Sequence, residues 1–182
     1  MEKICTNFVK KLLSYANYPQ ENDAIEIYTY GLLSFLYTLI PSFILISFSC
    51  CIGHPYEMLI WMFCFLTLRK YAGGIHAKTP IKCFILSILL GLSALFLCQH
   101  PTTLQPCAYF ACNIFNLILL TILAPATIKD FTNKQRFICK IKLLLFILAN
   151  AIIFYFFTNM QNYYLHALWS TTLLCIAQKL QK

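Results

Sequence analysis

Apolar residues along the chain gather in six long stretches, which short polar or turn-prone segments separate from one another. A helix needs about 20 residues to cross the hydrocarbon core of a bilayer, at a rise of about 1.5 Å per residue. The pattern therefore predicts an all-α, polytopic membrane helical bundle with six transmembrane spans. The second and sixth stretches are short, and we expect them to extend into flanking residues or to lie against neighbouring helices. The predicted spans lie near residues 31–51, 56–68, 83–98, 107–124, 143–158 and 165–177.

The first 18 residues follow a different pattern, in which apolar and polar residues recur with helical spacing. A helix with one apolar side and one basic side lies in the membrane interface rather than across the membrane. We therefore predict an amphipathic helix over residues 1–18 on the inner membrane surface. Its apolar stripe consists of Ile4, Cys5, Phe8, Val9, Leu12 and Leu13.

The composition supports a membrane protein and excludes two other classes. Of the 182 residues, 60% are hydrophobic, 16% are aromatic and only 11% are charged. Soluble domains are about half apolar and about a quarter charged, and disordered chains contain few aromatic residues. Because no internal repeat or low-complexity segment is visible, residues 1–182 are interpreted as a single integral membrane domain.

The charge distribution predicts how the chain is oriented in the membrane. The formal net charge is +8, and all 14 Lys and Arg residues lie near the termini or in alternate breaks between the apolar stretches. Basic residues accumulate on the cytoplasmic side of membrane proteins. We therefore expect a multi-pass protein of the cytoplasmic membrane, with both termini and the basic loops on the cytoplasmic side. The positive charge is interpreted as topology, and no nucleic-acid partner is expected.

Several chemistries lack the residues that they need in this sequence. The middle of the apolar stretches carries no Asp, Glu, Lys or Arg, which disfavours an ion-coupled transporter and an intramembrane aspartyl protease. No P-loop, HExxH or GxSxG motif is present, and the ten cysteines form no CxxC pair. We therefore predict no metal and no cofactor.

Most of the cysteines and three of the four histidines are interpreted as structural residues. A free cysteine packs as a small apolar side chain, and disulfides among the cysteines near the outer ends of spans are left open. The three histidines at outer ends are interpreted as ordinary interfacial residues. These cysteines are Cys50, Cys51, Cys98 and Cys107, and these histidines are His54, His100 and His166.

The basic break between the second and third stretches contains the remaining histidine, and a cysteine follows it. His76 and Cys83 are seven residues apart, which corresponds to roughly 10 Å along an unbroken helix. They can meet only if the backbone turns between them, and Gly73-Gly74 permits backbone angles that other residues avoid. Pro80 suits the first position of a helix, which places Cys83 in the first turn, where the helix dipole favours a thiolate. The spacing allows a nucleophilic Cys–His pair, but taken alone it favours a chance histidine beside a packing cysteine.

At these residues the chain resembles the AgrB (accessory gene regulator protein B) family of membrane-embedded cysteine endopeptidases in Gram-positive quorum sensing. The matching block, written R-x3-GG-x-H-x6-C, consists of Arg69, Gly73, Gly74, His76 and Cys83. The resemblance also includes the amphipathic start and the chain length, and it covers essentially the whole sequence.

The resemblance implies that the protein cleaves a small peptide precursor on its C-terminal side at the cytoplasmic membrane face. Cys83 would attack the scissile carbonyl to form an acyl-enzyme thioester, and His76 would activate the thiol and then protonate the leaving amine. An internal cysteine of the precursor would next displace Cys83 and form a cyclic thiolactone, the autoinducing peptide. Arg69 would bind a precursor carboxylate or hold the loop, and Gly73 and Gly74 would shape that loop or help at the oxyanion.

Four further points stay open at this level. The basic segment Lys129–Lys142 is interpreted as setting the topology and contacting anionic lipid, in preference to binding an acidic precursor. A third catalytic group could come from Asp130 or Asn133, and nothing in the sequence selects either. The expected partners are the peptide precursor and membrane lipids, with a homodimer left open. The alternative function is a non-enzymatic small membrane permease or peptide exporter, which a polar pocket at mid-membrane depth would distinguish.

Overall fold

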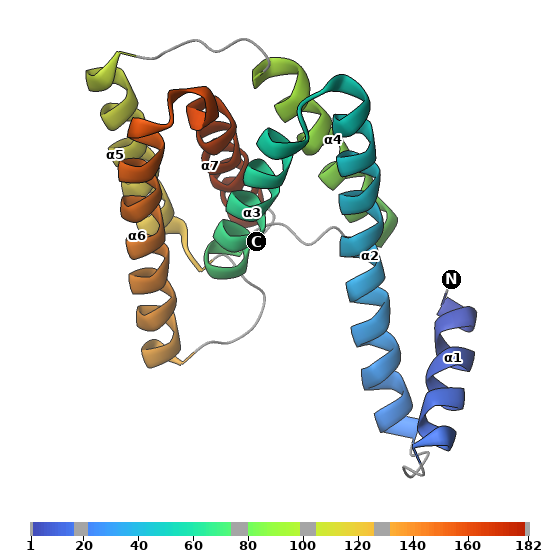
Figure 1. Cartoon of the computed structure of the whole chain (residues 1–182). Coiled ribbons are helices and arrows are strands. Elements are labelled where there is room, and N and C mark those ends of the chain that lie inside the picture. Colours follow the sequence, from blue (N-terminus) through green and yellow to red (C-terminus); the bar gives the residue numbers. More distant parts are fainter. Residues whose placement is uncertain (1, 17–21, 74–79, 99–104, 126–131, 181–182) are drawn as a thin grey trace. The chain divides into compact units, whose positions relative to one another are not determined.

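The computed structural model describes residues 2–16, 22–73, 80–98, 105–125 and 132–180, without the side chains of residues 22, 80–83 and 98. Within these ranges the chain forms seven helices, which confirms the predicted all-α class (Figure 1). The helices are α1 (Glu2–Tyr15), α2 (Asn22–Ile52), α3 (Pro55–Ala72), α4 (Pro80–Cys98), α5 (Pro106–Leu123), α6 (Asn133–Phe156) and α7 (Thr158–Leu180).

The contacts divide the chain into two compact units, residues 1–44 and residues 45–182. In the first unit, α1 confirms the predicted amphipathic helix and ends at Tyr15. One side of its apolar stripe packs against the start of α2, where Val9 and Leu13 contact Ile25. The other side of the stripe is not covered by protein, as a helix in a membrane interface requires. The uncovered residues are Ile4, Phe8 and Leu12, whose exposed fractions are 73%, 53% and 52%.

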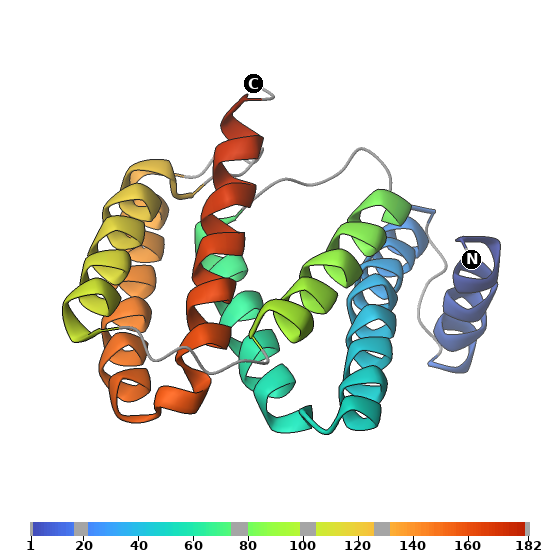
Figure 2. The same cartoon turned by 90° about the horizontal axis from the view of Figure 1, so that it is seen from above.

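Helix α7 lies at the centre of the second unit. It packs most extensively against α3, and it also contacts α4, α5 and α6 (Figure 2). Its buried side chains include the apolar Leu165, Leu168 and Leu174, but many are polar. The buried polar residues of α7 are Gln161, Ser170, Thr171, Thr172 and Gln178.

Two polar side chains of α7 bond asparagines on the neighbouring helix α5. The Tyr164 hydroxyl donates to Asn113 Oδ1 over 3.0 Å, and the Thr172 hydroxyl donates to Asn116 Oδ1 over 2.8 Å. Both asparagines lie on α5, and each also donates its amide to a backbone carbonyl four residues earlier. Because an unpaired polar group is costly in an apolar interior, these bonds make polar side chains compatible with the centre of the unit.

The contacts between helices also give their relative directions. Trp61 and Ala72 of α3 contact His166 and Cys175 of α7 in the same order, so α3 and α7 run parallel. Asn113 and Asn116 of α5 meet Tyr164 and Thr172 of α7 in the same order, so α5 is parallel to both.

Helix α6 runs in the opposite direction. Phe63 of α3 packs on Phe146, whereas Tyr71, which comes later in α3, meets the earlier Lys142. Successive spans of a membrane protein run in opposite directions. The described contacts agree with this, because α3, α5 and α7 are parallel to one another and α6, which lies between α5 and α7 in the chain, runs the other way.

Three helices are long and apolar enough to cross a membrane, by length and composition, among the residues that the structure describes. They are α2 over Asp23–Ile52, α5 and α6, and α4 contains a shorter apolar stretch, Phe84–Leu97. Helices α3 and α7 have the required 18 or more residues, but α3 carries Glu57, Arg69 and Lys70, and α7 contains several polar side chains. Both extend beyond the predicted second and sixth spans, as expected, and the count of six spans stays a prediction.

Candidate functional site

The predicted catalytic residues lie where α3 ends and α4 begins. Gly74 and His76 fall outside the described residues, and the side chain of Cys83 is not described. The pairing of His76 with Cys83 therefore stays a prediction. The structure describes the helix ends on either side of this segment, together with Arg69 and Gly73.

Gly73 terminates α3 with a backbone conformation that favours glycine. Its φ is 81° and its ψ is −143°. A residue with a side chain would be strained at these backbone angles. The Gly73 N–H donates to the Arg69 carbonyl over 2.9 Å and so satisfies one of the last carbonyls of the helix. Gly73 thus has the kind of backbone angle that the sequence predicted for the glycine pair, and Gly74 lies outside the described residues.

Helix α4 begins at Pro80, as the sequence predicted, and Cys83 is its fourth residue. Proline at this position has its φ angle preset for a helix, and its missing N–H would have no helical partner there. The backbone of Cys83 therefore belongs to the first turn, near the amides that carry the positive end of the helix dipole. Six residues, 74–79, connect the end of α3 to this turn.

The end of α3 is held by α7. Ala72 is fully buried, and its carbonyl lies 3.7 Å from the Cys175 Sγ atom. One turn further along α7, the Lys179 Nζ atom donates to the Ile122 carbonyl at the end of α5 over 3.5 Å. The C-terminal ends of α3, α5 and α7 therefore meet at the same end of the second unit as the predicted catalytic segment.

Arg69 lies one turn before Gly73 and is half-buried. Its guanidinium is 5.9 Å from the centre of the Phe65 ring, which is within the range of a cation–π interaction. This contact lies within α3, and both predicted roles of Arg69, binding a precursor carboxylate or holding the loop, stay predictions.

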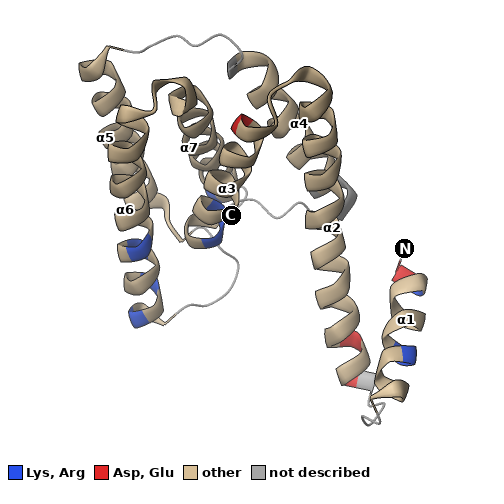
Figure 3. Cartoon of the chain, viewed as in Figure 1, with Lys and Arg blue, Asp and Glu red and all other residues tan. Residues whose placement is uncertain are grey.

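Basic residues of the second unit gather at the same end as the predicted site. Figure 3 shows them at the end of α3 and in the first half of α6, whereas Glu57 lies near the beginning of α3. On α6 the basic residues are Lys134, Arg136, Lys140 and Lys142.

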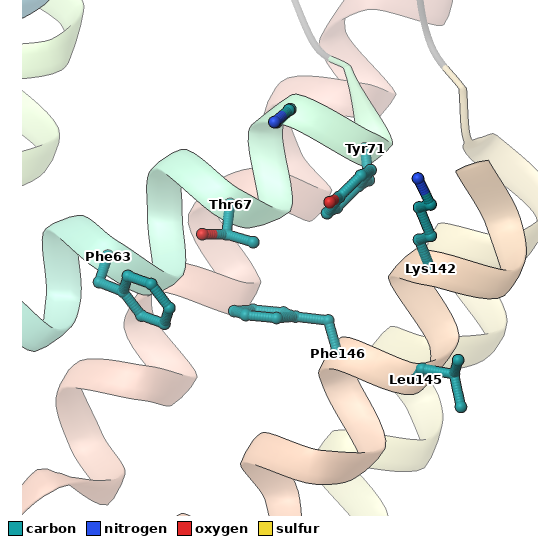
Figure 4. Close-up of a pocket in the computed structure, with 7 residues that line it drawn as sticks. Phe63, Thr67, Tyr71, Lys142, Leu145 and Phe146 are labelled. Atoms are coloured by element: carbon teal, nitrogen blue, oxygen red, sulfur yellow. The ribbon is translucent and has the colours of Figure 1, made fainter. Parts of the chain in front are cut away.

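An open groove with a volume of about 610 Å³ lies between α3 and α6, beside the end of α3 (Figure 4). At one end, the Nζ atoms of Lys70 and Lys142 lie 5.8 Å and 6.0 Å from the centre of the Tyr71 ring. At the other end, the rings of Phe63 and Phe146 have their centres 6.0 Å apart. The lining residues are Phe63, Thr67, Lys70, Tyr71, Lys142, Leu145 and Phe146.

This groove is absent from the sequence-based prediction, which assigned its lysines to topology. The two lysines lie in different basic clusters, 72 residues apart in the chain, and only the packing of α3 on α6 brings them together. The sequence contains one indication that the two lysines could meet. Each lies close to a long uncharged apolar run, which places both at the same depth in the membrane.

His166 also differs from its interpretation as an ordinary interfacial residue. It lies within α7, where its Nδ1 atom accepts from Trp61 Nε1 over 3.0 Å. Its Nε2 atom lies 3.1 Å from Ser93 Oγ, and that hydroxyl also bonds the Leu90 carbonyl. Because an indole N–H can only donate, Nδ1 is the acceptor and Nε2 carries the proton of a neutral imidazole. His166 therefore ties α3, α4 and α7 together.

The structure describes some of the other residues that were interpreted as structural. His54 precedes α3 and lies 3.3 Å from a carboxylate oxygen of Glu57. His100 and Cys98 are not described at the side-chain level. The eight described cysteines are all free, among them Cys50, Cys51 and Cys107.

Comparison with known proteins identifies a family that matches this chain. The family model described as "Accessory gene regulator B" matches residues 2–178. Two curated relatives, both AgrB-like proteins named provisionally, come from Clostridium perfringens. The protein from strain 13 / Type A is 29% identical over 119 residues, which are 65% of this chain and 51% of the relative. The protein from strain SM101 / Type A is 30% identical over 97 residues, which are 53% of this chain and 44% of the relative.

The chain thus spans about half the length of the curated relatives that it matches. No solved structure matches the chain. The family model nevertheless covers almost every residue from the amphipathic helix to the end of α7. The chain therefore belongs to the accessory gene regulator B family.

Proposed function

We propose that this protein is a membrane-embedded cysteine endopeptidase that cleaves a small quorum-sensing peptide precursor and promotes cyclisation of the product to a thiolactone. Membership of the AgrB family supports a role in the agr quorum-sensing system. The observation that carries the proposal is the backbone around the motif. Helix α3 stops at a left-handed Gly73, and α4 restarts at Pro80 with Cys83 in its first turn.

In the proposed first step, the Cys83 thiolate attacks the carbonyl carbon of the scissile peptide bond and forms a C–S bond. The tetrahedral adduct collapses with cleavage of the C–N bond, and the His76 imidazolium gives its proton to the leaving amine. The products of this step are an acyl-enzyme thioester on Cys83 and the released C-terminal part of the precursor.

In the proposed second step, a thiol of the precursor loses its proton to His76 and attacks the thioester carbonyl. A new C–S bond forms as the bond to Cys83 breaks, so one thioester replaces another and the enzyme is regenerated. Water would compete by hydrolysis, and a site at the membrane surface limits its access. Arg69, fixed at the end of α3, is the candidate for binding a precursor carboxylate.

The proposed site requires a defined membrane topology. We propose six spans, with both termini and residues 74–79 on the cytoplasmic side of the cell membrane. The parallel directions of α3, α5 and α7 and the reversed direction of α6 support this arrangement. The basic residues at the end of α3 and on α6 support the choice of side.

Co-expression of the chain with its peptide precursor tests the proposal. Cys83→Ala and His76→Ala should each reduce precursor cleavage by at least 100-fold, as expected when a nucleophile or its base is removed. Cys139→Ala, on α6, removes a half-buried thiol outside the motif and is the matched control. Each variant should reach the membrane in the same amount. Full cleavage by either motif variant would refute the proposal.

The alternative of a permease or peptide exporter would need polar groups free to bind a ligand at mid-depth. Two polar side chains in the middle of α7 bond other helices: His166 bonds Trp61 and Thr172 bonds Asn116. This use of their bonding capacity favours a role in helix packing. Transport of a peptide by the purified protein in vesicles would support the alternative instead.

A further inference from the structure

We propose that the groove between α3 and α6 is a binding site for an anionic phospholipid. Its headgroup would lie between Lys70 and Lys142, and an acyl chain would lie on Phe63 and Phe146 (Figure 4). This inference concerns lipid binding and does not depend on the proposed peptidase activity.

The charged end of the groove has the chemistry of an anion site. The ammonium groups of Lys70 and Lys142 come from different helices and converge on the Tyr71 ring, at 5.8 Å and 6.0 Å from its centre. None of the seven lining residues is acidic. A phosphate at this end of the groove would be attracted to both lysines, and basic pockets between membrane helices bind lipid headgroups in this way.

The other end of the groove has the chemistry of the bilayer interior. Phe63 lies seven residues before Lys70 on α3, or roughly 10 Å along the axis, and Phe146 lies one turn beyond Lys142 on α6. Phe63 and Leu145 are 62% and 59% exposed, so apolar surface is available to a ligand. The groove therefore changes from cationic to apolar along the direction in which a lipid changes from headgroup to acyl chain.

The depth of the lysines is consistent with the same ligand. Lys142 immediately precedes the uncharged run of residues 143–156, and Lys70 closely follows the uncharged run of residues 58–68. The helix α6 is long and apolar enough to cross a membrane. Both ammonium groups thus lie at the boundary between charged and apolar residues, which is where phosphate groups lie in a bilayer.

A peptide fits the groove less well than a lipid. A bound peptide brings N–H and C=O groups at every residue, and these need partners when water is excluded. Beyond the two ammonium groups, the lining side chains offer only the hydroxyls of Thr67 and Tyr71. An acyl chain has no such requirement, so the scarcity of polar partners favours the lipid.

Native mass spectrometry of the full chain in detergent tests this site, with equimolar phosphatidylglycerol and phosphatidylcholine as probes. We expect the wild-type protein to retain phosphatidylglycerol in preference to phosphatidylcholine. Removing both charges in the double variant Lys70→Gln, Lys142→Gln should lower that preference by about tenfold or more, since each basic residue near an anionic surface contributes to binding. Thr67→Trp keeps both lysines and should lower phosphatidylglycerol retention by filling the groove.

The double variant Lys134→Gln, Lys140→Gln is the matched control, because it removes two charges from α6 without changing the groove lining. This control should lose less of the preference for phosphatidylglycerol than the groove variant does, because Lys134 and Lys140 contact anionic lipid without lining the groove. Equal retention of the two lipids by the wild type, or an equal loss in the control, would overturn the proposal. Displacement of phosphatidylglycerol by a soluble acidic peptide, but not by a basic one, would assign the groove to a peptide instead.

Discussion

At the scale of single residues, a glycine and a proline define where α3 ends and where α4 begins. The turn at Gly73 and the helix start at Pro80 follow from local stereochemistry, which the residue types determine. The role of His166 depends on Trp61, which is 105 residues away in the chain. A hydropathy pattern carries no information on such a partner, so His166 was assigned to the interface.

Gly73 gives the prediction that belongs to this scale. Replacing it with alanine in Gly73→Ala should cost about 1–3 kcal/mol of strain, because its φ of 81° and ψ of −143° lie in a region that is nearly restricted to glycine. We expect a lower midpoint of thermal unfolding in detergent and reduced cleavage of a precursor. The strain falls on the turn that leads into the predicted catalytic segment.

Gly31→Ala is the control for this change. Gly31 lies within α2, and a methyl group there would meet nothing within 4 Å. Alanine is a better helix former than glycine, so stability should be unchanged or slightly higher. If Gly73→Ala behaved like Gly31→Ala in both measurements, the turn at Gly73 would not constrain this end of α3.

At the scale of elements, the helices could be predicted from apolar runs, but their lengths and partners could not. The second and sixth predicted spans are shorter than the helices α3 and α7, because polar or charged residues such as Gln161 end the apolar runs. In the structure Gln161 is buried within α7, which begins at Thr158. Hydropathy also does not separate a helix that faces lipid from one that other helices cover, so the central place of α7 was not foreseen.

The bond between Thr172 on α7 and Asn116 on α5 is testable at this scale. Both side chains are fully buried, and the hydroxyl donates to Oδ1 over 2.8 Å. A double-mutant cycle of Thr172→Val and Asn116→Ala should give a coupling of about 0.5–1.7 kcal/mol, the range of hydrogen bonds between membrane helices. Reversible unfolding in mixed micelles with increasing denaturing detergent would provide the four free energies.

A distant pair provides the comparison for this cycle. Thr121 bonds a carbonyl of its own helix, α5, so Thr121→Val combined with Thr172→Val should be additive within about 0.5 kcal/mol. Additivity in the Thr172–Asn116 cycle as well would mean that this bond does not hold α5 on α7.

At the scale of the whole molecule, charge and helix direction are two independent guides to topology. The positive-inside rule uses only the positions of Lys and Arg, whereas the helix directions follow from side-chain contacts. The contacts place α5 parallel to α7 and α6 antiparallel to α3. The beginning of α5 and the beginning of α6 must then lie at opposite ends of the second unit, which is also what the charge pattern requires.

Labelling of single cysteines in intact cells tests this topology. Cys107 is the second residue of α5 and is exposed and free, and Lys134 is the second residue of α6 and is also exposed. In a chain whose only cysteine is Cys107, a membrane-impermeant maleimide should label the protein from outside. In a chain whose only cysteine is introduced by Lys134→Cys, labelling should require permeabilised cells.

Labelling of both cysteines from outside would contradict the antiparallel packing of α5 and α6, whereas the reversed result would keep that packing and invert the protein in the membrane. The second outcome would place the end of α3 outside the cell, where a precursor made in the cytoplasm could not reach Cys83 before export.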